Sequence, residues 1–158
     1  GVGDVIVPHS EKRAIPTQLE NFTVPEVAAY SLESTVAEKF DAMLQRLELT
    51  SRMKDYYDIY YIAVTFDFDG RKLQEAIKQT LQIRGTDYYQ DSFDLLMSLS
   101  HNESMHHKWI LFLRKTGQQG PSFDTVMKTI DLFLRPAFQA ILDGNEWLEK
   151  WKCCGSWE

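Results

Sequence analysis

Residues 37–61, AEKFDAMLQRLELTSRMKDYYDIYY, decide how this chain folds and where its charges gather. Apolar residues around the first half of this stretch recur every three or four positions, which predicts an amphipathic helix that begins after Ser31. Its core stripe comprises Val36, Phe40, Met43, Leu44 and Leu47. A second helix is expected after Thr50 or Ser51, with a stripe at Met53, Tyr57, Tyr60, Tyr61 and Val64. Because the link is very short, we expect the two helices to pack as antiparallel neighbours.

Length and composition limit the class of protein. The chain has 158 residues, 44% of them hydrophobic, and a net charge of −6. One domain with a real core fits these values, whereas coating of nucleic acid by bulk electrostatics does not. No run reaches the ~18 apolar residues that a membrane span needs, and no signal-peptide pattern is present. We therefore expect a cytoplasmic location and no membrane partner.

The rest of the chain predicts a mainly α fold with five or six helices and one short strand. Residues 1–8, GVGDVIVP, have the pattern of a buried strand between Gly and Pro. The last long helix, which opens at Pro121-Ser122, should kink or split at Pro136, whose ring displaces the bond to Leu132. We expect three parts: a residual strand and connector (1–30), a helical domain (31–144) and an irregular Trp-rich C-terminal strap (145–158).

Further helices have recognisable start and stop signals. Asp69-Gly70 opens a helix whose inner positions are Leu73, Ala76, Ile77 and Leu81, and Gly85 ends it. A shorter helical stretch covers about 91–99, and another runs from Asn102 to Thr116.

Charged side chains flank the apolar stripes of the two central helices. Lys39 and Arg46 are seven residues apart and point the same way, while Asp55 and Asp58 share a face with Arg52 one turn before them. Lysine and arginine neutralise phosphate oxygens, and a carboxylate can hold Mg²⁺ or deprotonate a hydroxyl, so this set suits triphosphate handling. The alternative is a set of structural ion pairs that ties the two helices together.

The aromatic run at Tyr56, Tyr57, Tyr60 and Tyr61 also has two interpretations. These rings could stack nucleobases, as in proteins that bind single strands. Tyrosines at helical spacing are more often part of a core, so core packing is the favoured interpretation.

Three histidines suggest a metal site at first sight. His106 and His107 fall beside the Met105–Trp109 stripe, where they should face water, and neither they nor His101 have a third well-spaced ligand. We therefore predict no metal site from these residues.

Two segments at a fixed distance form a specific pattern: Ala37-Glu38-Lys39, and the R-x-K-D-x-Y-D motif from Arg52 to Asp58. Shorter segments extend it at Tyr30–Glu33, Phe66–Gly70, Arg84–Thr86, Trp109, Phe112–Lys115 and Gly155–Glu158. With these residues the chain resembles the C-terminal half of nucleotidyltransferase toxins of the AbiEii/AbiGii family. The resemblance covers nearly the whole chain and implies the helical part of an α+β nucleotidyltransferase-like fold.

The resemblance implies metal-dependent transfer of a nucleotide from a nucleoside triphosphate (NTP), by toxins of toxin–antitoxin and phage-defence systems. Mg²⁺ and the NTP are the implied cofactors, relatives act on tRNA ends, and an antitoxin is an implied partner. By this resemblance Lys39, Arg46 and Arg52 contact the nucleotide. Asp55 and Asp58 match the acids of the motif and are the implied catalytic residues.

The chain also departs from the family pattern. The Gly-Ser turn and Asp-x-Asp pair that supply the family's metal site do not precede the helices, and Asp67-Phe68-Asp69 has the pattern of a helix start instead. We therefore expect a chain that lacks the N-terminal catalytic half and transfers no nucleotide alone, which leaves open whether it is an enzyme. The alternative function is a non-catalytic helical module that binds an antitoxin or a separate catalytic half.

Overall fold

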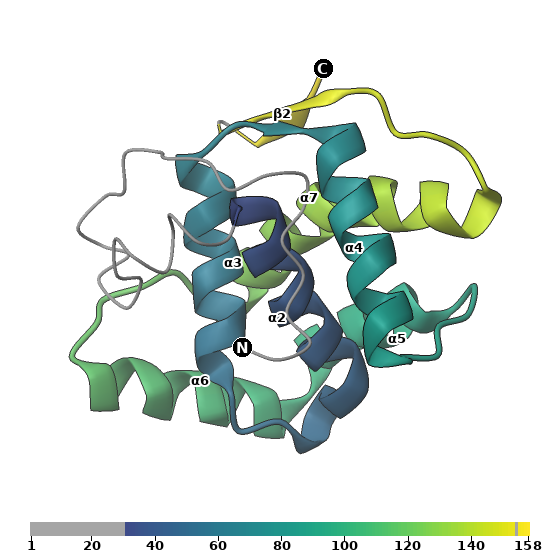
Figure 1. Ribbon diagram of the computed structural model, residues 1–158. Coiled ribbons are helices and arrows are strands. Elements are labelled where there is room, and N and C mark those ends of the chain that lie inside the picture. The colour runs from purple at the N-terminus through teal and green to yellow at the C-terminus, as the bar shows by residue number, and fades with distance from the viewer. Residues whose placement is uncertain (1–30, 154) are drawn as a thin grey trace.

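A computed structural model describes residues 31–153 and 155–158 of the chain (Figure 1). This part is mainly α, as predicted; the strand expected at 1–8 and the connector expected at 9–30 lie outside it. Its α-helices are α2 (Leu32–Arg46), α3 (Met53–Thr65), α4 (Gly70–Arg84), α5 (Ser92–Met97), α6 (Glu103–Thr116) and α7 (Phe123–Asp143). Two 3₁₀ turns, η2 (Leu47–Leu49) and η3 (Ser98–His101), and three short strands, β1 (Phe68–Asp69), β2 (Lys150–Lys152) and β3 (Ser156–Trp157), complete it.

Helix α3 packs against α2, α6 and α7. Helices α2 and α3 run in opposite directions (Figure 1), so the prediction of antiparallel neighbours is confirmed. Their stripes meet in a continuous core that also takes in α4 and α7, with Phe40, Ile59, Ile77 and Phe133 fully buried. None of the helices within the described residues is long and apolar enough to cross a bilayer.

Most predicted helix ends are confirmed. The Ser31 hydroxyl accepts a hydrogen bond from the Ser34 amide at 3.1 Å and caps α2, and the Asp69 carboxylate caps α4 by accepting from the Arg71 amide at 3.0 Å. The cap expected at Thr50 or Ser51 is wrong. The N-cap of α3 is Arg52. The Thr50 hydroxyl accepts a hydrogen bond from the Arg52 amide at 3.0 Å, in the turn just before the helix.

The buried face of α3 differs from the predicted stripe. Tyr56, Ile59 and Ile62 are fully buried, because α2 and α7 pack against α3. Tyr60 and Tyr61 are only half-buried, and Val64 is exposed. The aromatic stripe therefore belongs to the core over its first turn and reaches the surface over its second.

Helix α7 is continuous through Pro136, so of the predicted kink or split the split is wrong. Proline has no N–H and cannot bond the carbonyl of Leu132 one turn earlier. The indole N–H of Trp157 donates to that carbonyl instead, at 2.9 Å. A side chain from the end of the chain thus replaces the hydrogen bond that the helix lacks.

The C-terminal tail is not the irregular strap that was expected. Strand β2 pairs antiparallel with β1 on one side and β3 on the other, with Trp151 opposite both Phe68 and Trp157. The Trp151 ring is fully buried, and its indole N–H donates to the Ala63 carbonyl at 2.7 Å. Its tryptophans give this segment enough apolar surface to pack, and the pairing with β1 satisfies its backbone.

Candidate functional site

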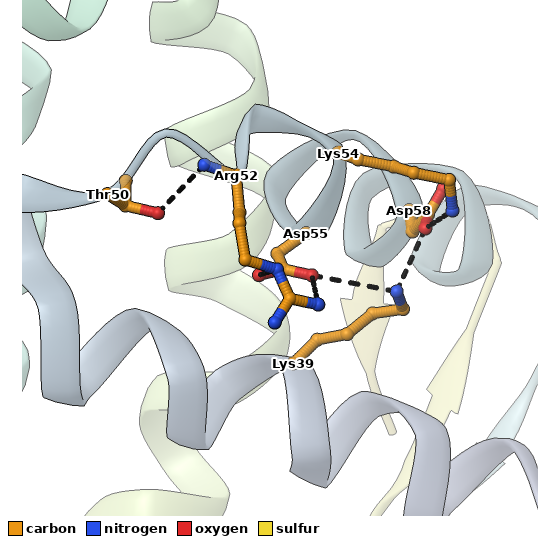
Figure 2. Close-up of polar contacts among 6 residues, drawn as sticks. All are labelled: Lys39, Thr50, Arg52, Lys54, Asp55 and Asp58. Carbon is orange, nitrogen blue, oxygen red and sulfur yellow. Dashed lines mark hydrogen bonds and ion pairs between the residues drawn. The ribbon is translucent and has the colours of Figure 1, made fainter.

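Lys39 of α2 reaches across to two acids of α3 (Figure 2). Its ammonium nitrogen lies 2.9 Å from Asp58 Oδ2 and 3.7 Å from Asp55 Oδ1. The two acids share a face because they are three residues apart on one helix, and Lys39 stands on the facing helix. The structure thus brings together three of the residues predicted from the sequence.

Each acid has a second cationic partner. Arg52 approaches Asp55 with two nitrogens, Nε at 3.3 Å from Oδ2 and an Nη at 3.3 Å from Oδ1. Lys54 pairs with Asp58 one helical turn away. We call Lys39, Arg52, Lys54, Asp55 and Asp58 the Lys39 cluster.

Burial is divided by sign within the Lys39 cluster. The two carboxylates are 3% exposed, whereas the side chains of Lys39, Lys54 and Arg52 are 15%, 39% and 51% exposed. Three cations over two buried carboxylates leave one net positive charge when all are ionised. The cluster therefore presents cationic groups to the solvent and keeps its anionic groups beneath them.

The pKa of Asp55 is raised above its ordinary value. Burial is the largest cause, and repulsion by Asp58 adds to it, while Lys39, Arg52 and Arg46 oppose it by attraction. The cations thus offset only part of the desolvation cost of this carboxylate. Ionised Asp55 therefore depends on its ion pairs with Lys39 and Arg52 to be stable in the folded protein.

Arg46 lies apart from the other predicted residues. It ends α2, its side chain is exposed, and it acts on Asp55 through its charge. Lys54, by contrast, was absent from the predicted site although it stands within the R-x-K-D-x-Y-D motif. Its spacing of four residues from Asp58 is the signal that could have identified it, because such pairs meet on a helix surface.

Lys108 of α6 supports the segment that carries Arg52. Its ammonium donates to the carbonyls of Glu48 and Thr50, at 2.7 and 2.9 Å. Thr50 in turn accepts from the Arg52 amide. Helix α6 therefore anchors the connection between α2 and α3 at the edge of the Lys39 cluster.

The described residues do not offer a site that fits Mg²⁺. They contain no group of three or more His, Cys, Asp or Glu side chains placed to hold a metal ion. Asp55 and Asp58 each already face two cationic groups, which would repel a divalent cation.

Of the two histidines expected to face water, His107 is exposed and His106 is only partly so. Its Nε2 lies 2.5 Å from the Ser100 carbonyl, and its ring meets Phe123 edge-on at 5.3 Å. His106 is a half-buried packing residue, because the η3 turn folds back over the start of α6.

Comparison with known proteins identifies the family. No curated protein and no solved structure matches this chain. Residues 1–143 match the family model described as "Nucleotidyl transferase AbiEii toxin, Type IV TA system". This match includes every residue of the Lys39 cluster. The chain belongs to the AbiEii family of nucleotidyl transferase toxins of type IV toxin–antitoxin systems.

Proposed function

We propose that the Lys39 cluster binds the triphosphate group of an NTP in a nucleotidyl transfer reaction. The observation that carries this proposal is the division of charge: exposed cations lie above buried carboxylates, with a net positive charge. Phosphate oxygens are satisfied by lysine and arginine donors of this kind. A site with this sign favours an anionic ligand over a metal ion.

Each cation has a distinct part in this proposal. Arg52, the most exposed, can offer a phosphate the guanidinium N–H groups that do not approach Asp55, and Lys54 adds a second exposed charge. Lys39 is held between α2 and α3 by Asp55 and Asp58, so its ammonium is fixed before any ligand arrives. Such preorganisation lowers the cost of binding and of stabilising charge in the transition state.

The chemistry follows from nucleotidyl transfer itself. An acceptor hydroxyl oxygen bonds to the α-phosphorus, the α–β phosphoanhydride bond breaks, and pyrophosphate leaves with the bonding electron pair. The proton of the acceptor hydroxyl passes to water. The cations of the cluster would neutralise the charge that grows on this leaving group. The acceptor proposed from the family resemblance is a tRNA end.

A catalytic role for Asp55 and Asp58 stays a prediction from the family resemblance. Their contacts favour a positioning role, because both carboxylates are buried and each faces two cationic groups. In that role they act through Lys39 and do not touch the reacting atoms.

A second candidate function is a module that binds an antitoxin. Helix α6 favours it, because Ile110 and Leu111 stand exposed at 48% and 46% on its outer side, close to the cationic Arg114 and Lys115. Apolar surface of this kind, bordered by charge, is typical of protein contacts.

Calorimetric titration with NTPs tests the first proposal. Arg52→Ala and Lys54→Ala should each weaken NTP binding by about tenfold, because each removes a charged donor. Arg71→Ala is the matched control, since Arg71 is an exposed arginine that pairs with Glu146 away from the cluster. We expect no transfer of labelled nucleotide to tRNA by this chain alone with Mg²⁺, so NTP binding is the measurement that tests the cluster. Binding that is indifferent to both cluster variants would overturn the proposal.

A further inference from the structure

The tyrosines of α3 divide into two pairs in the structure. Tyr56 and Tyr57 are buried in the core, whereas Tyr60 and Tyr61 keep part of their surface open. Tyr61 follows Lys54 by seven residues and Asp58 by three, so all three lie along one face of α3. A partly open aromatic ring thus continues the line of the Lys39 cluster.

Neighbouring rings hold Tyr61 in place. Its ring centroid lies 4.6 Å from that of Tyr57 and 5.4 Å from that of Tyr60, the latter edge-on at 89°. Tyr57 is itself fixed, because its hydroxyl donates to Gln118 Oε1 at 2.7 Å and its ring packs on Trp109 and Phe112. Tyr61 is therefore held in place by packing, and a ligand that stacks on the part of the ring that is not buried loses little additional side-chain freedom.

We propose that Tyr61 stacks on the nucleobase of the NTP. This inference rests on the proposed function, in which the Lys39 cluster binds the phosphates. Tyr61 follows Lys54 by seven residues, about 10.5 Å along the helix axis, so phosphates at Lys54 and a base at Tyr61 would lie at opposite ends of one NTP. Lys54 precedes Asp58 on the same line, at the end of the cluster away from Tyr61.

This arrangement also predicts the nucleotide preference. Stacking uses the π-face that every base has, and it is tolerant of base identity. Tyr61 should therefore bind NTPs of all four bases, with purines favoured by their larger stacking area. The residue is a specificity element for nucleotides over bare polyphosphate.

Titration with two ligands separates this inference from the proposed function. The probes are ATP and inorganic tripolyphosphate, added to the full chain with the wild-type sequence, Tyr61→Ala and Tyr61→Phe. Tyr61→Ala should weaken ATP binding by about tenfold and leave tripolyphosphate binding within about twofold of wild type. Tyr61→Phe keeps the ring and should retain ATP binding. Tyr89→Ala, at an exposed tyrosine away from α3, is the control.

Each result decides one question. Equal loss of both ligands in Tyr61→Ala, or no loss of either, overturns the stacking role. Wild-type binding of tripolyphosphate still supports the phosphate site in both cases. Loss of ATP binding in Tyr61→Phe that matches Tyr61→Ala also overturns it, since the ring is then not the relevant group. Failure of the wild type to bind tripolyphosphate counts against the phosphate site itself, and the stacking role falls with it.

Discussion

Lys39 Nζ lies 2.9 Å from Asp58 Oδ2 and joins α2 to α3 through a carboxylate that is almost completely buried. The same ammonium is 3.7 Å from Asp55, so one lysine serves two acids. Removing either partner of this ion pair should destabilise the fold whether or not the cluster binds a ligand, because a buried charge without its partner lowers the free energy of unfolding. Stability and ligand binding must therefore be measured side by side in every variant of this cluster.

Asp58→Ala should lower the free energy of unfolding by about 3 kcal/mol, because it leaves the ammonium of Lys39 without its nearest carboxylate. Lys54→Ala removes the more exposed partner of the same carboxylate and should cost less than about 1 kcal/mol. Urea unfolding followed by circular dichroism measures both values. An equal loss of unfolding free energy in the two variants would show that the more buried ion pair does not stabilise the fold more than the exposed one.

Arg52 should behave in the opposite way, with a small effect on stability and a large one on binding. Its side chain is 51% exposed, so Arg52→Ala should cost less than about 1 kcal/mol of folding free energy. Arg52→Lys keeps the charge but loses the paired donors, and NTP affinity should fall between those of wild type and Arg52→Ala. Thermal melting and calorimetric titration of the three proteins check this. A variant that melts far below wild type would mark Arg52 as structural.

Asp55 predicts a pH dependence of stability. Burial raises the pKa of Asp55 in the folded protein above its ordinary value of 3.8, so the folded state binds this proton more tightly than the unfolded state. The stability that results is fully present below 3.8 and is lost as the pH rises through the folded-state pKa. Asp55→Asn stays neutral at every pH.

Wild type should therefore lose stability relative to Asp55→Asn as the pH rises from about 3.5 to 7, measured by urea unfolding at each pH. A difference that is constant over this range, or that changes in the opposite direction, would show that Lys39 and Arg52 outweigh the desolvation of Asp55.

Local signals predicted most of the helices. Ser31, Asp69 and Ser122 cap helices as expected, because their side chains accept bonds from the first free amides. Gly85, Gly117 and Gly144 end helices in the left-handed conformation, as glycine allows. These features depend on a few neighbouring residues, so one sequence suffices to recognise them.

Features that depend on distant segments were predicted less well. The face of α3 that is buried is set by α2 and α7, and periodicity alone selected Tyr60, Tyr61 and Val64 in place of Tyr56, Ile59 and Ile62. The β2–β3 pair depends on β1, which lies far earlier in the chain. The grouping of the charged side chains was predicted more fully, because helical spacing fixes which charges share a face. Arg46 acts on Asp55 only through its charge, and the Lys54–Asp58 pair was not predicted.

The contact between Trp157 and α7 supplies a final prediction. Pro136 leaves the Leu132 carbonyl without its helical donor, and the Trp157 indole N–H takes that place at 2.9 Å. Trp157→Phe should therefore cost about 1 kcal/mol in wild type. In a Pro136→Ala background the new amide can bond Leu132, and the same substitution should cost less, with a coupling of about 0.5 kcal/mol or more.

Trp147→Phe is the matched control for this cycle. Trp147 packs edge-on against Trp157 at 5.5 Å, but in the part of the chain that the structure describes its buried indole N–H has no hydrogen-bond partner. Its substitution should cost the same in wild type and in the Pro136→Ala background. Unfolding free energies of the single and double variants give both couplings. If Trp157→Phe costs equally in both backgrounds, the indole is not a substitute for the missing helical bond, and ring packing on Phe133, Trp147 and Trp151 explains its contribution.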